Sequence, residues 1–142
     1  MNINILPGDQ MDAGNMLSFF EAVQLNNQAN RLLSEQNFAG ALKKYQRAIA
    51  LKESVFGPRT LNSCISLSGL CDAYIGLGDL ASARREATRM LQIAQEIDQS
   101  DQVRIARELL ADIAKAEAKK WEEHYEKKLS SKITFFISYI LI

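Results

Sequence analysis

Apolar residues recur every three or four positions through most of this chain, which is the spacing of an amphipathic helix. The spacing predicts five helices, over residues 18–36, 38–53, 61–77, 80–97 and 101–128. The alternating pattern of a half-buried strand is absent until the last ten residues. The sequence therefore predicts an all-α fold.

Local signals give the helix boundaries. Residues 18–21 have the form of a capping box, so we expect the first helix to begin at Ser18. Gly57-Pro58 closes the second helix, because glycine can cap a helix and proline cannot continue one. Thr60 is the expected N-cap of the third helix. Gly78-Asp79 predicts a turn, in which glycine tolerates the left-handed conformation and aspartate caps the next helix.

The same pattern of side chains returns after 42 residues. The equivalent positions are Leu25, Leu67 and Leu109, then Ala29, Cys71 and Ile113, and then Ala41 and Ala83. A fixed period between about 20 and 50 residues is typical of stacked repeats, in which each unit buries its apolar face against the next. Proteins of this kind usually bind other proteins.

These residues resemble the tetratricopeptide repeat (TPR) family, and within it the 42-residue type found in kinesin light chains. The positions that match the family pattern are Leu67, Leu70, Cys71, Tyr74, Gly78 and Ala83 in the second repeat, and Ala41, Tyr45 and Ala48 in the first. Ala87 and Met90 depart from it. The resemblance covers residues 20–118 and implies an α-solenoid of two helix-turn-helix units. A third repeat starts at Leu109 but is incomplete, so the fifth helix is expected to be a long C-terminal capping helix.

The expected domain organisation has three parts: a flexible leader over residues 1–17, the solenoid over 18–128 and an apolar tail over 129–142. The resemblance implies a concave groove that binds a peptide segment of a partner protein. Its lining would be Val23, Asn26, Asn30, Leu33, Ile65, Ser68, Asp72, Ile75, Arg107 and Leu110. Part of this face could instead pack on missing repeats or on the leader.

The carboxylate clamp of chaperone-binding TPR proteins is a poor match. Asn30 fits that pattern, but Asn26 and Gly69 replace its expected lysine and second asparagine. The sequence therefore predicts a protein-protein interaction module with an unidentified partner. The alternative is a regulatory or adaptor fragment of a larger TPR protein whose activity lies in missing regions.

Composition and motifs narrow the function further. Lys plus Arg and Asp plus Glu are both 17, so the formal net charge is zero and the basic excess typical of nucleic-acid binders is absent. We find no catalytic motif, and so expect no enzyme, no cofactor and no small-molecule substrate. His124 is expected on the surface, and Trp121 is expected to seal the end of the core. Because we recognise no signal peptide and no disulfide framework, we expect a cytoplasmic protein.

The two cysteines, Cys64 and Cys71, are seven positions apart, which is about 10 Å along one helix. That separation is too long for a disulfide, and the spacing does not suit a zinc site. We expect both to be small apolar packing residues and expect no metal site.

The segment 133–142 differs from the rest, because its β-branched and aromatic residues favour a strand. Three interpretations remain open. It could be a tail packed on the solenoid, a weak membrane-interface anchor helped by Lys127, Lys128 and Lys132, or non-native sequence from a truncated or mis-spliced reading frame. Ten residues are about half of what a helix needs to span a bilayer, so we expect membrane association to be unlikely beyond such an anchor.

Overall fold

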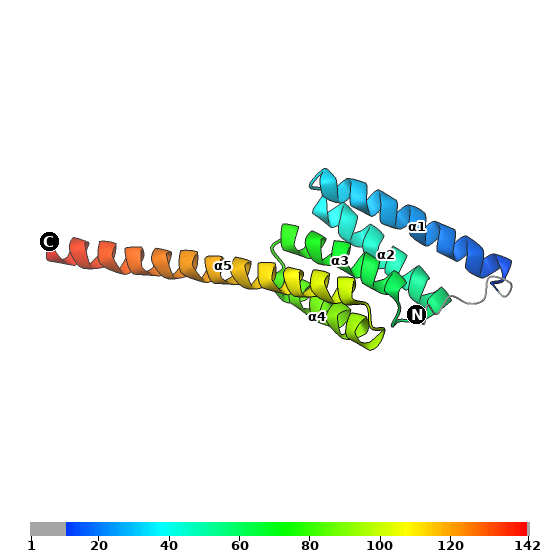
Figure 1. Cartoon of the computed structure of the whole chain (residues 1–142). Coiled ribbons are helices and arrows are strands. Elements are labelled where there is room, and N and C mark those ends of the chain that lie inside the picture. Colours follow the sequence, from blue (N-terminus) through cyan, green and yellow to red (C-terminus); the bar gives the residue numbers. More distant parts are fainter. Residues whose placement is uncertain (1–10, 142) are drawn as a thin grey trace.

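The computed structural model describes residues 11–141 of the chain, and the described part is helical without any strand (Figure 1). The first ten residues, which make up most of the expected leader, and residue 142 lie outside it. The elements are α1 (Ala13–Ser34), α2 (Phe38–Phe56), α3 (Leu61–Gly76), α4 (Leu80–Glu96) and α5 (Ser100–Ile140). The predicted all-α class is confirmed.

The start of α1 was predicted wrongly. Asp12 is the N-cap, and its carboxylate accepts a hydrogen bond from the backbone N–H of Asn15 at 2.7 Å. Ser18 consequently lies inside α1, and residues 13–17 are helical instead of belonging to a leader. Aspartate is as strong an N-cap as serine, and its negative charge also favours the N-terminus of a helix.

The two helical hairpins, α1–α2 and α3–α4, are closed by the same turn. Its left-handed residue is Gln36 (φ 60°) in the first hairpin and Gly78 (φ 76°) in the second. The next residue, Asn37 or Asp79, donates its backbone N–H to the carbonyl five residues earlier, at 2.8 and 3.0 Å. The side chain of that residue accepts from the backbone N–H three residues ahead, at 3.0 and 3.1 Å. The 42-residue period of the sequence is therefore a period of the backbone as well.

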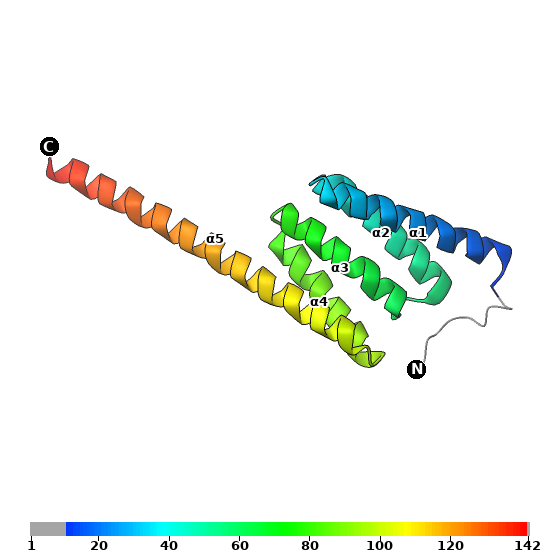
Figure 2. The same ribbon diagram turned by 45° about the horizontal axis from the view of Figure 1, so that its top comes forward.

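The helices pack mainly on their neighbours in the chain (Figure 2). Helix α3 is the exception, because it contacts each of the other four. Within the described residues, the backbones of α1 and α2 do not approach those of α4 and α5, although an ion pair joins Glu53 on α2 to Arg89 on α4. The two halves of the molecule are therefore joined mainly through α3.

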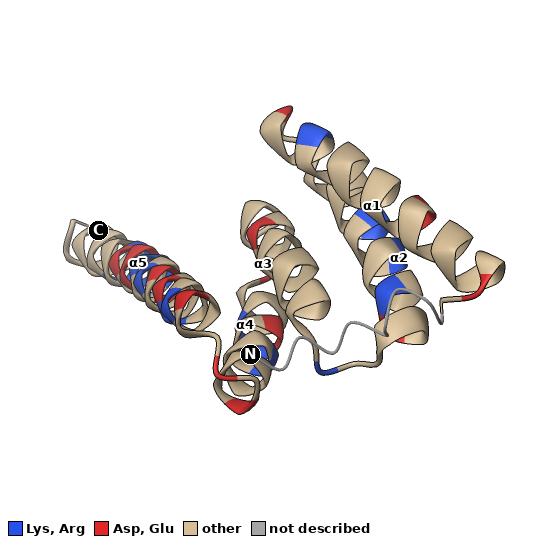
Figure 3. Cartoon of the chain, turned by 45° about the vertical axis from the view of Figure 1, so that its right-hand side comes forward, with Lys and Arg blue, Asp and Glu red and all other residues tan. Residues whose placement is uncertain are grey.

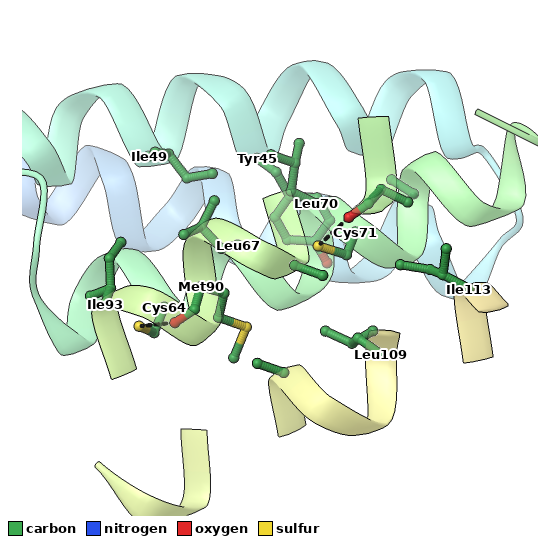
Figure 4. Packing of buried hydrophobic residues seen from close by; sticks show 14 of the residues in the cluster. Tyr45, Ile49, Cys64, Leu67, Leu70, Cys71, Met90, Ile93, Leu109 and Ile113 are labelled. Atoms are coloured by element: carbon green, nitrogen blue, oxygen red, sulfur yellow. Dashed lines mark hydrogen bonds between the residues drawn. The ribbon is translucent and has the colours of Figure 1, made fainter. Parts of the chain in front are cut away.

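Small residues allow the helices to approach closely, and the core lies around α3 (Figure 4). Leu67 and Ala83 are fully buried, as their repeat positions predict. A Cβ added at Gly69 would overlap the ring of Tyr45, and one at Gly76 would overlap the ring of Phe38. The two glycines therefore give the aromatic rings of α2 their space against α3.

Helix α5 packs on the bundle through its first half only. Its buried residues are Ala106, Leu109 and Ile113, and every described residue from Ala118 onward is exposed. Figure 1 shows the second half projecting beyond the other helices. The interpretation of Trp121 as a seal of the core is wrong, because its side chain is 72% exposed.

The expected end of this helix near residue 128 and the strand preference of the tail are also wrong, because α5 continues to Ile140. It has no glycine or proline to end it, and hydrogen bonds within a helix propagate once the helix has formed. No helix among the described residues has an apolar stretch long enough to cross a membrane.

Deleting residues 131–142 is expected to leave the melting midpoint of the bundle nearly unchanged and to improve solubility. The reason is that no described side chain in this segment is buried, whereas several large apolar ones face solvent. Thermal melts followed by circular dichroism measure the effect. A longer deletion that also removes Leu109 and Ile113 serves as the control and should destabilise the bundle. A large loss of stability from the short deletion would show that the tail contributes to the core.

Candidate functional site

The structure distributes the ten predicted groove residues over three helices. Those on α1 are Val23, Asn26, Asn30 and Leu33, those on α3 are Ile65, Ser68, Asp72 and Ile75, and those on α5 are Arg107 and Leu110. Asn30, Ile65, Asp72 and Arg107 are exposed, whereas the other six are half-buried. Of these six, Leu33, Ile75 and Leu110 pack against the core.

Two consecutive hydrogen bonds connect the helices α2, α3 and α1, and they end at the side chain of Asn26. The ammonium group of Lys52 on α2 donates to the hydroxyl of Ser66 on α3 at 2.7 Å, and this hydroxyl donates to Oδ1 of Asn26 on α1 at 2.8 Å. Lys52 is only 4% exposed, and no ion pair among the described residues includes it. Burial accordingly lowers the pKa of Lys52.

The sequence analysis missed these two hydrogen bonds. The available signal was the position of Lys52, which continues the helical spacing of Ala48, Ile49 and Val55 on the buried face of α2. A lysine in an apolar stripe indicates a specific acceptor within reach, because a buried charge needs a hydrogen-bonding partner.

The side chain of Asn30 also accepts a hydrogen bond from a neighbouring helix. The hydroxyl of Tyr45 donates to Oδ1 of Asn30 at 2.6 Å, and Tyr45 itself is 1% exposed. Burial, with a smaller contribution from the nearby charge of Asp72, raises the pKa of Tyr45. Because the side-chain oxygens of Asn26 and Asn30 accept bonds from neighbouring helices, their amide N–H groups are the donors left for a ligand. The two residues are one helical turn apart on α1.

Asp72 brings negative charge to α3. Its side chain is exposed, yet the surrounding helices desolvate the carboxylate in part, and this raises its pKa. The charge of Asp112 on α5 adds to the increase. The sequence analysis placed Arg107 and Leu110 on this side of α5 and missed Asp112. A basic group of a ligand would be attracted to the two carboxylates.

Arg107 lies in a different environment from the one expected. It lines an open depression of about 610 Å³ between the end of α4 and the start of α5, together with Ala94, Gln95 and Val103. No residue of α1 or α3 lines this depression. The structure therefore brings together polar groups of α1 and α3, and it separates Arg107 from the asparagines.

Charged residues are unevenly distributed (Figure 3). Helix α1 carries only Glu21 and Arg31. Most of the ion pairs that join different helices lie elsewhere, such as those of Arg84 with Glu117 and of Arg89 with Glu53. The α1 part of the candidate site is thus mainly an amide and apolar surface.

A second depression, of about 660 Å³, lies where α5 passes the start of α4. It is lined by residues 78–81 and by Glu117, Lys120, Trp121 and His124. The ring of Trp121 stacks on that of Tyr125, with centroids 6.2 Å apart and an interplanar angle of 14°. His124 is exposed, as expected.

The two cysteines are free and fully buried, which confirms their prediction as packing residues. Their thiols point to backbone carbonyls of α4, Cys64 to Met90 and Cys71 to Ala83 (Figure 4). Burial raises the pKa of Cys64 to about 11 and that of Cys71 to about 12. Both are therefore inert as nucleophiles near neutral pH. Across residues 11–141, no cluster of His, Cys, Asp or Glu side chains is suited to hold a metal ion.

Comparisons of this chain with protein-family models, with curated proteins and with solved structures found no match.

Proposed function

We propose that this chain is a TPR-like α-solenoid that binds an extended peptide segment of a partner protein across α1 and α3. The observation that carries the proposal is the repetition of one turn, with the same hydrogen bonds, in two hairpins 42 residues apart. Helix α3, which joins the two halves, supports it further. Stacked hairpins of this kind present extended surfaces to their ligands.

The chemistry of the α1–α3 surface suits a peptide backbone. Asn26 and Asn30 are four residues apart, so their amide groups are about 6 Å apart along α1. Carbonyl groups on one side of an extended peptide recur at about 6.6 Å, which is close to this spacing. Asp72, with Asp112 nearby, favours a basic or hydrogen-bond-donating side chain of the ligand. The partner would thus supply two backbone carbonyls and a neighbouring positive charge.

Replacing Asn30 with Ala is expected to weaken binding of the partner peptide by roughly 1–2 kcal/mol, because the complex then lacks the amide hydrogen bonds that it would bury. From the sequence alone, little change in thermal stability would be expected, because the free groove is solvated. The structure predicts instead a loss of about 1 kcal/mol, because the buried hydroxyl of Tyr45 loses its acceptor. Affinity capture from native lysate with mass spectrometry identifies the partner, and isothermal titration with its synthetic peptide measures the affinity.

Tyr45→Phe is the matched control, because it removes the same internal hydrogen bond and leaves the Asn30 amide in place. It should reproduce the stability loss with a smaller loss of affinity. Asp72→Lys should reverse any preference for basic peptides. If the captured partner binds Asn30→Ala and Asp72→Lys as tightly as the parent chain, the α1–α3 surface is not the binding site.

A further inference from the structure

The end of α5 is an isolated apolar helix. We define its tip as residues 133–141, which lie beyond any contact with the bundle (Figure 2). Its exposed large side chains, between 50% and 81% accessible, are Ile133, Phe135, Phe136, Ile137, Tyr139, Ile140 and Leu141. A surface of this kind in water indicates a binding function or a tendency to aggregate.

The apolar side chains surround most of the tip and do not form a single stripe. Successive residues of a helix are about 100° apart, so the runs 135–137 and 139–141 each cover more than half of the circumference. Together the two runs cover about two thirds of the circumference, and Thr134 and Ser138 occupy the rest. A helix that is apolar around most of its circumference is most stable where apolar surroundings cover most of it. A second copy of α5 would cover only one side of the tip, whereas lipid chains would cover all of it.

The hydroxyl groups of Thr134 and Ser138 in the tip already donate hydrogen bonds to carbonyl groups of the same helix. Thr134 donates to the carbonyl of Ser130 and Ser138 donates to the carbonyl of Thr134, both at 2.9 Å. Serine and threonine are accommodated in apolar surroundings by this type of bond. The remaining polar side chain of the tip is that of Tyr139, whose aromatic ring is largely apolar.

The charges next to the tip have one sign. Lys127, Lys128 and Lys132 precede it, and the segment 127–141 contains no Asp or Glu. Figure 3 shows that the charged residues of α5 stop before its C-terminal end. Lysines beside an apolar segment attract anionic headgroups, and their long side chains reach the interface while the apolar residues lie deeper.

We propose that residues 133–141 insert into one leaflet of a membrane that contains anionic lipids, with the three lysines at the headgroups. Nine helical residues are about 14 Å long, which matches half of the roughly 30 Å hydrocarbon layer. The nine residues of the tip are by themselves too short to span the bilayer. This inference goes beyond the proposed peptide binding, and it replaces the expectation from sequence that membrane association is unlikely. The exposed segment before the tip then holds the bundle away from the membrane.

Vesicle co-sedimentation of the full chain tests the proposal, with phosphatidylcholine vesicles compared with vesicles that also contain phosphatidylserine. The parent chain should bind the anionic vesicles about a hundredfold more tightly than the neutral ones, because each of the three lysines contributes about 1 kcal/mol. Phe136→Asp combined with Ile140→Asp should abolish binding. The control combines Trp121→Asp with Tyr125→Asp, which has the same spacing, the same added charge and similar exposure on the same helix. It should retain most of the binding.

The depth of insertion can be measured separately, because Trp121 is the sole tryptophan of the chain. In a variant with Trp121→Phe and Phe136→Trp, the fluorescence should shift to the blue with anionic vesicles and be quenched by brominated lipid chains. Trp121 of the parent chain lies about 22 Å closer to the bundle along α5, so its fluorescence should show neither effect.

Three results would overturn the proposal. In the first, the parent chain binds neither the neutral nor the anionic vesicles. The second is an equal loss of binding in the two aspartate pairs, which would show that any exposed apolar pair of α5 matters. The third is a dimer in lipid-free solution, detected by sedimentation velocity, that the tip variant dissociates while vesicles remain unbound. That outcome would identify a second copy of the chain as the occupant.

Discussion

Leu67→Ala is expected to lower the free energy of unfolding by about 2–5 kcal/mol, because the shorter side chain buries less apolar surface and leaves a cavity behind. Leu67 is fully buried on α3, the helix that packs against all the others, so the surrounding side chains have little freedom to fill the space. The opposite change on the facing helix, Ala83→Leu, is expected to cost roughly 1–3 kcal/mol, because Ala83 is also fully buried and the added atoms would overpack the core.

Urea unfolding followed by circular dichroism measures both effects. Leu77→Ala is the matched control, because this leucine follows α3 and is 46% exposed, and it should change stability by no more than about 0.5 kcal/mol. Unfolding midpoints near that of the parent chain for Leu67→Ala and Ala83→Leu would show that the repeat register and the core described above are wrong.

Alkaline pH is expected to destabilise the protein through its two cysteines. A thiol in the unfolded chain ionises near pH 9.0, whereas burial keeps Cys64 protonated to about pH 11 and Cys71 to about pH 12. Above pH 9 the folded state therefore binds more protons than the unfolded state, and stability falls as the pH rises. Between pH 9 and 11 the loss should be roughly 2 kcal/mol for each thiol. Below pH 9 this contribution to stability is fully present.

Other buried groups titrate in the same range, so the comparison has to isolate the thiols. The raised pKa of Tyr45 adds to the loss, and the lowered pKa of Lys52 opposes it. Urea unfolding of the parent chain and of Cys64→Ala/Cys71→Ala, under reducing conditions at several pH values, cancels these contributions. The double variant should be less stable at pH 8 because of its cavities, with a flatter dependence on pH. If the free energy of unfolding of the two proteins depends on pH in the same way, the thiols do not cause the loss of stability.

The sequence predicted the parts of the fold that local chemistry controls. Gly57 and Gly78 adopt positive φ at the predicted turns, and Thr60 and Asp79 cap the helices that follow them. The two wrong predictions, of the start of α1 and of the structure of the tail, have a common cause, because in each case two local preferences competed. Two sequence signals competed at the start of α1, where Asp12 prevailed over Ser18. In the tail, the strand preference of side chains was weaker than the continuity of a helix that nothing interrupts.

The candidate site was less predictable, because its geometry depends on contacts between helices. The sequence identified Asn26 and Asn30, but not the partners that orient them, since Ser66 and Tyr45 are 40 and 15 positions away. Asp112 was missed for a similar reason. Its relation to Asp72 follows from the way α5 lies against α3, and no pattern within α5 reports this.

The predominance of contacts between chain neighbours has a consequence for biosynthesis. The α1–α2 hairpin is complete once residue 56 has been made, and it needs neither α4 nor α5 for any of its own contacts. Folding rates are high when most contacts join residues close in sequence, because little loop entropy is lost before each contact forms. The first hairpin should thus be able to form beside the ribosome before α3 emerges. Each later helix would then add to a surface that is already in place.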